Sequence, residues 1–413
     1  MIRPFGPAAI ALATILPGIA AAQCDIDATG SVRILSNDFA ALDLIMERAR
    51  SCASEELELS INQTEEHKNL QVPALSIDPA EYTVALIANN SLPALLNRDL
   101  VRPLDDLVAQ YGEQLSDAQL VRIGGDTVAV TFMVNGMHLF LRPDILAEAG
   151  IDETPQSWDD VLDAAEAVRA AGLLDHPIVG AYAPGWDLAQ EFVNMYSGTG
   201  APFFEPGTAE PAIAGAEGIA VLEKMKALTE YMDPDYLAVD ALEAARVWGA
   251  GDAAIMNMWA SQAGPLIDEG GDYPQVAANT ELAPAPRMEG NEIPSGALFW
   301  DGFSIAANVP DEDAAASFQV MMHAIAPELA QENPTGASWM IEGYAPAPNA
   351  VGVMANVDAG GVAYPTLPYM DLMHAALGDE LADYLQGNET AEEALAGVEA
   401  AYTAAARESG FLN

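Results

Sequence analysis

The sequence predicts an α/β protein with two lobes, and three observations lead to that prediction. The chain has 413 residues, more than one ordinary hydrophobic core accommodates, so we expect two domains. Hydrophobic residues make up 51% of it, which is enough to fill both interiors. Strand and helix signals alternate along the chain, as in sheets covered by helices. Because no low-complexity linker separates the halves, we expect several strands to cross between the lobes.

The first third of the chain supplies the clearest strand signals. A strand begins at Val32, residues 39–50 follow with helical spacing of apolar residues, and residues 57–61 resemble a second strand. Residues 82–88 and 127–134 are continuous apolar runs, which are typical of parallel strands covered on both faces. We therefore expect the sheets to be mostly parallel.

Helix signals dominate the rest of the chain. Ser157 with Asp160, and Thr390 with Glu393, have the spacing of a capping box, in which two side chains satisfy the first amides of a helix. Residues 219–232 carry apolar side chains at helical spacing. These signals predict three helices.

The N-terminal segment predicts export. Arg3 precedes an apolar stretch at residues 8–19, and three alanines end it at Ala22. This is the architecture of a secretory signal peptide, with cleavage expected after Ala22. A membrane anchor would need about 20 apolar residues, and Gln23 is too large for the residue that precedes a lipidated cysteine. We therefore expect a periplasmic protein with no direct membrane insertion.

The two cysteines, Cys24 and Cys52, predict a disulfide, since an even pair in an exported protein favours one. Closing a loop of about 28 residues would stabilise the fold by roughly 3–4 kcal/mol. The alternative is a pair of buried free thiols. Without a Cys-x-x-Cys motif, the sequence argues against redox catalysis and thiolate zinc sites.

The net charge of the chain limits the classes of molecule that it can bind. Acidic side chains number 62 and basic ones 15, which gives a net charge of −47. Such a surface repels nucleic-acid phosphates and anionic lipids, and it argues mildly against an anionic ligand. The acids are spread along the chain, as on a solvated surface. We attribute them to a salt-rich habitat, a hypothesis that greatest stability in low salt would contradict.

Motifs for metals and cofactors do not stand out in the sequence. The five histidines are scattered, and no Gly-x-Ser-x-Gly elbow, phosphate-binding glycine loop or twelve-residue calcium loop occurs. We therefore expect no metal and no cofactor. An acid-rich chain always offers pairs of carboxylates at glycosidase distance, so an exported glycosidase stays open as an alternative.

Four tryptophans lie beside turn-forming or polar residues: Trp186, Trp259, Trp300 and Trp339. An aromatic ring packs against the C–H face of a sugar while neighbouring polar side chains bind its hydroxyls. We therefore expect ligand contacts from the first three tryptophans and from the adjacent Asp301 and Tyr344. The alternative is that these rings are ordinary, partly buried aromatics.

The order of the segments resembles the extracellular solute-binding proteins of ABC importers, in particular the maltose-binding type. Residues 139–158, LFLRPDILAEAGIDETPQSW, carry the most specific match. Further matching segments span residues 82–107, 245–259 and 367–395. The resemblance covers nearly all of the mature chain.

The resemblance implies a type II periplasmic-binding-protein fold, in which a hinge of crossover strands joins two lobes and the ligand cleft lies between them. The N-terminal lobe would comprise residues 23–130 and 301–342, and the C-terminal lobe residues 131–300 and 343–413. The crossovers would be residues 126–134, 293–300 and 341–348.

Local matches to the family imply further ligand contacts. Beyond Trp186 and Trp259, the matching positions are Asn37, Asp38, Asn89, Asn90, Ser91, Asn135 and His374. Asn90 and Asn135 replace carboxylates of maltose binders, and His374 replaces a tryptophan, which argues against maltose itself. Taken residue by residue, each asparagine has the alternative interpretation of a turn residue.

The implied function has no bond-making step. The ligand bridges both lobes and favours the closed state, which a membrane permease recognises. We expect a monomer that binds a neutral sugar, glycoside or polyol. Besides the glycosidase, a binding protein for a phosphorylated or cationic solute stays open. Arginines lining the cleft would indicate phosphate, and acids surrounded by aromatic rings would indicate a cation.

Overall fold

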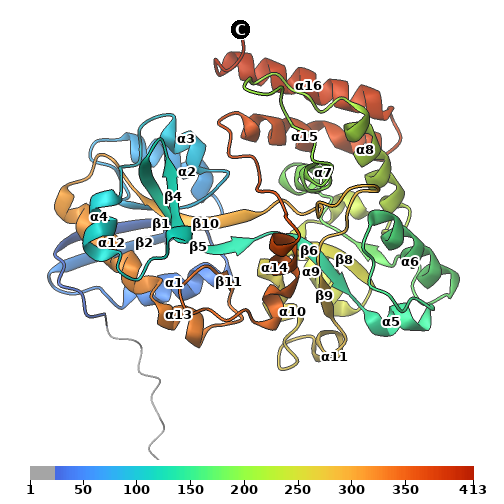
Figure 1. Cartoon of the computed structure of the whole chain (residues 1–413), viewed down its shortest axis with the longest axis horizontal. Coiled ribbons are helices and arrows are strands. Elements are labelled where there is room, and N and C mark those ends of the chain that lie inside the picture. The colour runs from blue at the N-terminus through green and yellow to red at the C-terminus, as the bar shows by residue number, and fades with distance from the viewer. Residues whose placement is uncertain (1–23) are drawn as a thin grey trace, which may run out of the picture.

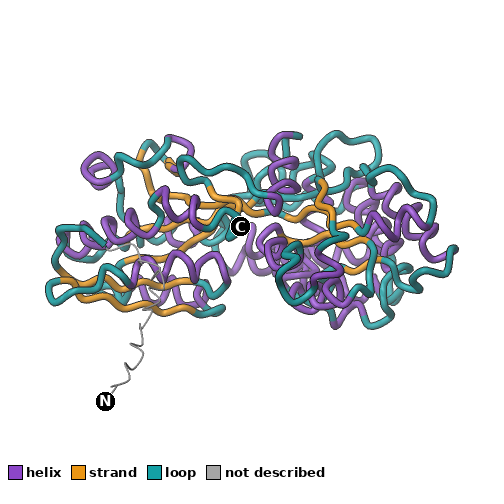
Figure 2. Tube along the Cα trace, turned by 90° about the horizontal axis from the view of Figure 1, so that it is seen from below, coloured by secondary structure: helices purple, strands orange, loops and turns teal. Residues whose placement is uncertain are grey.

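The computed structural model describes residues 24–413, and these residues form two α/β lobes that lie side by side (Figure 1). The predicted signal peptide, residues 1–22, and its cleavage site lie outside the described residues. Each lobe has its own sheet and its own apolar core. In a second view, each lobe contains both strands and helices, and strands of the first lobe run along its lower edge (Figure 2).

The first lobe contains a seven-stranded sheet. Its strands are β1 (Gly30–Ser36), β2 (Leu57–Gln63), β3 (Val84–Ala88), β4 (Leu120–Ile123), β5 (Asp126–Asn135), β10 (Phe299–Ile305) and β11 (Ser338–Trp339). The order is β11-β5-β10-β3-β1-β2, with β4 paired to the other part of β5. The expected strands at Val32 and at residues 57–61, 82–88 and 127–134 are all present.

Helices cover this sheet from both halves of the sequence. They are α1 (Ala40–Arg50), α2 (His67–Ser76), α3 (Leu92–Leu96), α4 (Asp105–Tyr111), α12 (Asp311–Ala324) and α13 (Pro327–Glu332). A short 3₁₀ turn, η1 (Asp117–Gln119), precedes β4. Helix α12 packs against β1 and α1, so the two halves of the sequence share one core.

The second lobe contains a four-stranded sheet of order β7-β8-β6-β9. Its strands are β6 (Met137–Leu141), β7 (Ile178–Val179), β8 (Ile255–Trp259) and β9 (Glu281–Ala283). The helices around it are α5 (Pro143–Glu148), α6 (Trp158–Ala170), α7 (Trp186–Ser197), α8 (Ala216–Thr229), α9 (Ala241–Ala250), α10 (Ala263–Leu266), α11 (Pro274–Ala277), α14 (Val351–Asp358), α15 (Met370–Leu385) and α16 (Ala391–Glu408). Three 3₁₀ turns complete the lobe, namely η2 (Tyr236–Ala238), η3 (Ala260–Gln262) and η4 (Pro348–Ala350).

Both predicted capping boxes are present. The amide of Asp160 donates to Ser157 Oγ at 3.1 Å, and the amide of Ser157 donates to Asp160 Oδ2 at 2.9 Å. Thr390 and Glu393 make the same reciprocal pair at the start of α16. The apolar pattern at residues 219–232 corresponds to α8, which ends three residues earlier than the pattern.

The expectation of mostly parallel sheets is wrong. Among the named strands of the described chain, only β1–β2, β1–β3 and β7–β8 pair in parallel, whereas the pairs made by β5, β6 and β10 are antiparallel. The apolar run of β5 reflects complete burial and not a parallel strand, because every strand beside it runs the opposite way. There are two causes: β10 returns from the other lobe and enters the sheet in reverse, and β4 and β5 form a hairpin across Gly124 and Gly125.

The crossings lie together between the two lobes. Strand β5 continues through Gly136 directly into β6 of the other sheet. The chain returns before β10, where the side-chain amide of Asn89 donates to the carbonyl of Leu298 at 3.1 Å. It leaves the first lobe again after β11 and reaches η4. The hinge is therefore built from segments far apart in the sequence.

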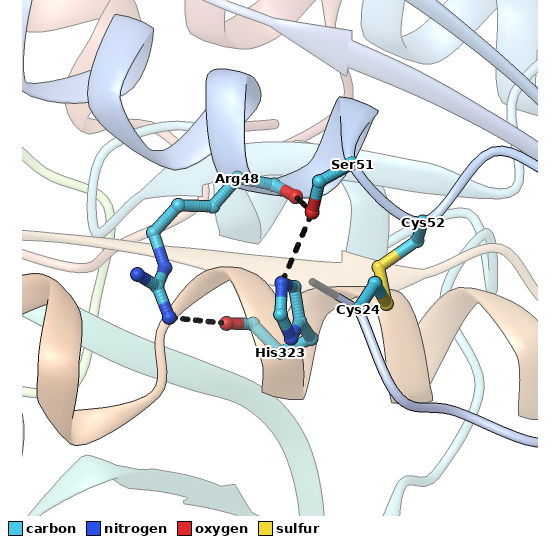
Figure 3. Close-up of a disulfide and its surroundings, with 5 residues drawn as sticks. All are labelled: Cys24, Arg48, Ser51, Cys52 and His323. Atoms are coloured by element: carbon cyan, nitrogen blue, oxygen red, sulfur yellow. Dashed lines mark hydrogen bonds between the residues drawn. A yellow bond between two sulfur atoms is a disulfide. The ribbon is translucent and has the colours of Figure 1, made fainter. Parts of the chain in front are cut away.

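The predicted disulfide between Cys24 and Cys52 is present, with a Cα–Cα distance of 4.9 Å. It joins the start of the described chain to the turn after α1 (Figure 3). His323 on α12 lies beside it, with Nε2 3.2 Å from Ser51 Oγ, and Arg48 donates to the His323 carbonyl at 3.5 Å. The disulfide thus lies where α1 meets α12.

Candidate functional site

A cavity of about 350 Å³ lies between the two lobes and receives side chains from both. It is lined by Asn37, Phe39, Glu65, His67, Lys68, Ala88, Asn90, Asn135, Trp186, Trp259, Ser261, Gln262, Phe299 and Asp301. Strands β1, β2 and β3 are parallel, so their carboxyl ends meet at one edge and bring three of these loops together. The second lobe contributes the end of β8 and the start of α7.

Strand β10 provides one wall of the cavity through Phe299 and Asp301. Alternate residues of a strand point to the same face, which places these two side chains together. Asp301 is paired in register with Ala88 of β3, and the small methyl group leaves space beside the carboxyl group. Within residues 24–413 the Asp301 side chain has no hydrogen-bond or ion-pair partner. Burial raises the pKa of Asp301 to about 7.

Amide side chains supply further polar groups. Asn90 and Gln262 reach the cavity without a side-chain hydrogen bond to any other described residue. Asn37 uses its oxygen to accept from the amide of Asp38 at 2.9 Å, which leaves its NH₂ group available. These three side chains therefore offer donors and acceptors that the fold itself does not use.

Asn135 has a different role, because its side chain is engaged within the protein. Its Oδ1 accepts from the amides of Gly136 at 3.0 Å and Ser261 at 3.2 Å, and its Nδ2 donates to Ser261 Oγ at 3.3 Å. These bonds join the hinge end of β5 to the turn η3 after β8. Asn135 therefore positions the loop that carries Ser261 and Gln262.

Two tryptophans reach the cavity from the second lobe. Trp259 ends β8 and meets Phe299 in an edge-type contact, with ring centroids 5.2 Å apart at 76°. Trp186 begins α7 and stacks on His374 at 3.8 Å and 21°. The ammonium of Lys68, from the first lobe, lies 4.6 Å from the centre of the Trp186 ring.

Burial shapes the charges around the cavity. Desolvation lowers the pKa of Lys68, while the carboxylate of Asp371 partly opposes that shift. Burial also lowers the pKa of His67 to about 4 and that of His374 to about 3, so both imidazoles are neutral at neutral pH. The cavity therefore presents the acids Glu65 and Asp301 against one lysine.

Six of the sequence-predicted contact residues line the cavity: Asn37, Asn90, Asn135, Trp186, Trp259 and Asp301. The other six lie outside its lining. Asp38 is exposed, Asn89 is buried at the hinge, and Ser91 closes a turn by accepting from the Ala88 amide at 3.2 Å. Trp300 and Tyr344 pack against the core of the first lobe, and His374 lies behind Trp186.

The sequence interpretation missed the loop after β2. Glu65, His67 and Lys68 follow a parallel strand, as do Asn37 and Asn90, so the rule about strand ends applies to them as well. Phe39, Ser261, Gln262 and Phe299 are neighbours of predicted residues and were also missed as lining groups.

A second, larger cavity of about 770 Å³ adjoins the first at the same boundary between lobes. Ser261 lines both cavities. The wall of the second cavity includes Leu44 of α1, Tyr273 and the acids Asp268, Glu269 and Asp272. The space between the lobes therefore extends beyond the part lined by tryptophans.

The described part of the chain offers one close group of metal-ligand side chains, Cys24, Cys52 and His323, and both sulfurs there belong to the disulfide. Across residues 24–413, no helix is long and apolar enough to span a bilayer.

Comparison with known proteins identifies related sequences and folds. Residues 72–319 match the model of the bacterial extracellular solute-binding protein family. Direct comparison with curated protein sequences gives no match.

Several solved structures share the fold. Maltose-bound MalE3 of T. maritima superposes with a TM-score of 0.76 at 16% identity, covering 90% of this chain and 99% of that one. A solute-binding protein of an ABC transporter from Agrobacterium radiobacter, in complex with ribitol, gives 0.75 at 17% identity, with 90% and 97% covered. One from Agrobacterium vitis with bound D-mannitol gives 0.75 at 16%, with 92% and 99% covered. The predicted two-lobed periplasmic-binding-protein fold is therefore confirmed.

Proposed function

The chain belongs to the bacterial extracellular solute-binding protein family, and we propose that it captures a sugar or polyol between its lobes as the binding component of an ABC importer. The observation that carries this proposal is the cavity between the lobes. It combines the aromatic ring of Trp259 with the free polar side chains of Asn90, Gln262 and Asp301. A ring for the C–H face and dispersed polar groups for the hydroxyls form a suitable site for a carbohydrate.

The proposed mechanism is lobe closure. A ligand that contacts both lobes stabilises the closed arrangement by its differential contacts, and a membrane permease then recognises that arrangement. We assign residues 23–130 with 301–342 to one moving body and residues 131–300 with 343–413 to the other. Fold relatives with bound maltose, ribitol and D-mannitol support the class of ligand.

We also propose where the protein works. Export through a signal peptide cleaved after Ala22 would give a periplasmic monomer that begins at Gln23. Edman sequencing or intact mass of the exported protein tests the start of the chain. A mature protein that retains residues 1–22 would contradict the proposal.

We propose that the protein binds its ligand without chemical turnover. A glycosidase needs two carboxyl groups facing each other across the glycosidic bond. Glu65 and Asp301 both line the cavity, so the test is direct: incubation with chromogenic glycosides should release no chromophore. Steady release that is lost on substitution of either acid would favour the glycosidase.

A cationic ligand is the second candidate, and one observation favours it over a phosphorylated ligand. No arginine lines the cavity within the described chain, whereas Asp301 lies beside Phe299 and shares the cavity with Trp186 and Trp259. Acids among aromatic rings suit an ammonium group and not a phosphate.

A thermal-shift screen against sugars, polyols, amines and phosphates tests the main proposal. A true ligand at 100 times its Kd stabilises the folded state by about 2.7 kcal/mol, which is a clear rise in Tm. Small-angle scattering of the same mixtures should show a smaller radius of gyration. A protein stabilised only by phosphates, or one whose radius is unchanged at saturation, would contradict the proposal.

A further inference from the structure

Asp301 presents a carboxyl group that the described fold leaves without a partner. Its neighbours in register are Ala88 of β3 and Met133 of β5, and neither side chain donates a hydrogen bond. Phe299, two residues earlier on the same face, adds an apolar ring. A carboxylate with little access to water is unfavourable unless a cation or hydrogen-bond donors satisfy it. Asp301 is partly exposed and lines the cavity, so its partner must be a molecule that enters the cavity, either the ligand or water.

The protein's own cations do not fill that role. Lys68 lies over the Trp186 ring, where Asp371 attracts its ammonium, and it makes no ion pair with Asp301. His67 is held neutral at neutral pH by burial. Glu65 is the remaining ionisable group of the loop after β2.

The other cavity-lining elements add no charge near Asp301. They contribute the side chains of Asn37, Phe39, Ala88, Asn90, Asn135, Trp186, Trp259, Ser261, Gln262 and Phe299, none of which is ionised at neutral pH. The balance within the cavity is therefore acidic.

The cavity also accommodates an ammonium group against aromatic carbon. The Lys68 ammonium already lies 4.6 Å from the centre of the Trp186 ring, which is a favourable cation–π distance. Trp259 and Phe299 are packed together at 5.2 Å and line the same cavity as Asp301. An amine bound at Asp301 would thus have a carboxylate partner and aromatic neighbours.

We propose that the ligand carries a protonated amine that pairs with Asp301, which narrows the substrate class to amino sugars and aminated polyols. The proposal rests on the proposed function, because it assumes that the cavity between the lobes binds a carbohydrate.

The number of protons released on binding can be measured, and it distinguishes an amine ligand from a neutral one. Burial holds a large fraction of Asp301 in its neutral form near pH 7. When the ammonium binds, the carboxyl proton passes to the buffer, and the carboxylate then pairs with the ammonium, which keeps all of its own protons. A neutral ligand that accepts a hydrogen bond from the protonated carboxyl group would release no proton. Titration calorimetry in buffers of different ionisation enthalpy separates these cases.

The experiment uses two matched sets of probes at neutral pH. Glucosamine, N-acetylglucosamine and glucose differ only at one substituent, and the corresponding β-1,4-linked disaccharides form the second set. We expect an amine-bearing member to bind at least tenfold tighter than its hydroxyl counterpart, with release of a proton. Asp301→Asn keeps the size of the side chain and should abolish both the preference and the proton release. Asp358→Asn, which removes an exposed acid on α14, should change neither.

Each outcome decides the proposal. The amine proposal is overturned if the hydroxyl or acetamide members bind as tightly as the amine members or more tightly. It is also overturned if the amine preference survives in Asp301→Asn, or if the amine members do not bind at all. If the amine proposal fails in one of these ways but the protein binds neutral sugars, mannitol or ribitol, the proposed function as a carbohydrate-binding protein still stands. If no carbohydrate binds at all, both proposals fail.

Discussion

Lys68 and Trp186 meet across the boundary between the lobes, with the Lys68 ammonium 4.6 Å from the centre of the indole ring. The same ring stacks on His374 at 3.8 Å, and His374 in turn lies 3.1 Å from the Trp186 carbonyl and 3.2 Å from the Tyr364 hydroxyl. Trp186 is therefore held firmly within the second lobe, and Lys68 is the group that reaches it from the first. A sugar could stack on this ring only if Lys68 moved away.

The first prediction is that Lys68 helps to hold the lobes together. Trp186 is 39% exposed, and a cation–π contact at such a site contributes about 0.5–1 kcal/mol, which corresponds to a shift of about two- to fivefold between closed and open arrangements. Lys68→Met keeps the apolar stem but removes the ammonium, so the open arrangement should be more populated in the ligand-free protein and its radius of gyration should increase, while saturating ligand should still reduce the radius of both proteins. Lys68→Arg retains a cation and should match the wild type. An unchanged radius in Lys68→Met would show that the contact does not control closure.

The second prediction concerns the disulfide. Replacement of Cys24 and Cys52 by serine should lower the free energy of unfolding by roughly 3–4 kcal/mol, because the unfolded chain gains the freedom of an open loop of about 28 residues. Urea denaturation of both proteins measures the difference. In the unreduced wild-type protein, thiol titration after unfolding should detect no free thiol, and two free thiols would refute the bond.

Local signals predicted most of the fold, and one global property escaped them. Capping at Ser157 and at Thr390 depends on residues three positions apart, so the sequence displays it directly. Strand direction depends on where the chain crosses between lobes. Strand β10 returns from the second lobe and pairs antiparallel with β3 and β5, and no local signal within residues 299–305 indicates that direction. The predicted parallel sheets were wrong for this reason.

The site was predicted in part, for similar reasons. Asn37 and Asn90 follow strands, and a rule about strand ends finds them. Trp300 and Asp301 were both expected in the cleft, yet successive strand residues point to opposite faces, so only Asp301 reaches the cavity. Lys68 has the appearance of a solvated charge in the sequence. Its contact with Trp186, which is far away along the chain, exists only in the folded protein.

The third prediction is a pH dependence of stability that originates at Glu191. This residue is buried on α7, and burial, reinforced by the charge of nearby Asp187, raises the pKa of Glu191 to about 8. Between the ordinary glutamate value and about pH 8 the folded state holds a proton that the unfolded state has released. Stability should therefore fall as pH rises through this range.

The variant Glu191→Gln keeps the shape of the side chain and removes its titration. Between about pH 6 and pH 8 the free energy of unfolding of this variant should fall less steeply than that of the wild type, because Glu191 no longer titrates. The other raised carboxyl group of α7, Asp187, has a pKa of about 6 and therefore affects stability mainly below this range. Urea denaturation at a series of pH values measures both slopes. Glu148→Gln changes an exposed acid and should follow the wild type. Parallel slopes for Glu191→Gln and the wild type would show that Glu191 is ionised in the folded protein.

The fourth prediction distinguishes a binding role from a structural role for Trp259. Trp259 ends β8 and is partly exposed at the cavity, and within the described chain Phe299 is the one aromatic ring that packs against it. If the ring stacks on the ligand, Trp259→Ala should weaken binding by about 2 kcal/mol, or about thirtyfold in Kd. The ligand-free protein should lose much less stability than the 3–5 kcal/mol or so that truncation of a core aromatic costs.

Calorimetry with the ligand identified by the thermal-shift screen gives the first quantity, and urea denaturation of the ligand-free protein gives the second. Trp248, which is fully buried, provides the matched control, because Trp248→Ala should show the large loss of stability typical of a core ring. If Trp259→Ala unfolds as readily as the control but binds with unchanged affinity while folded, Trp259 is a structural residue. The stacking surface would then have to be sought at Trp186, with Lys68 displaced from its face.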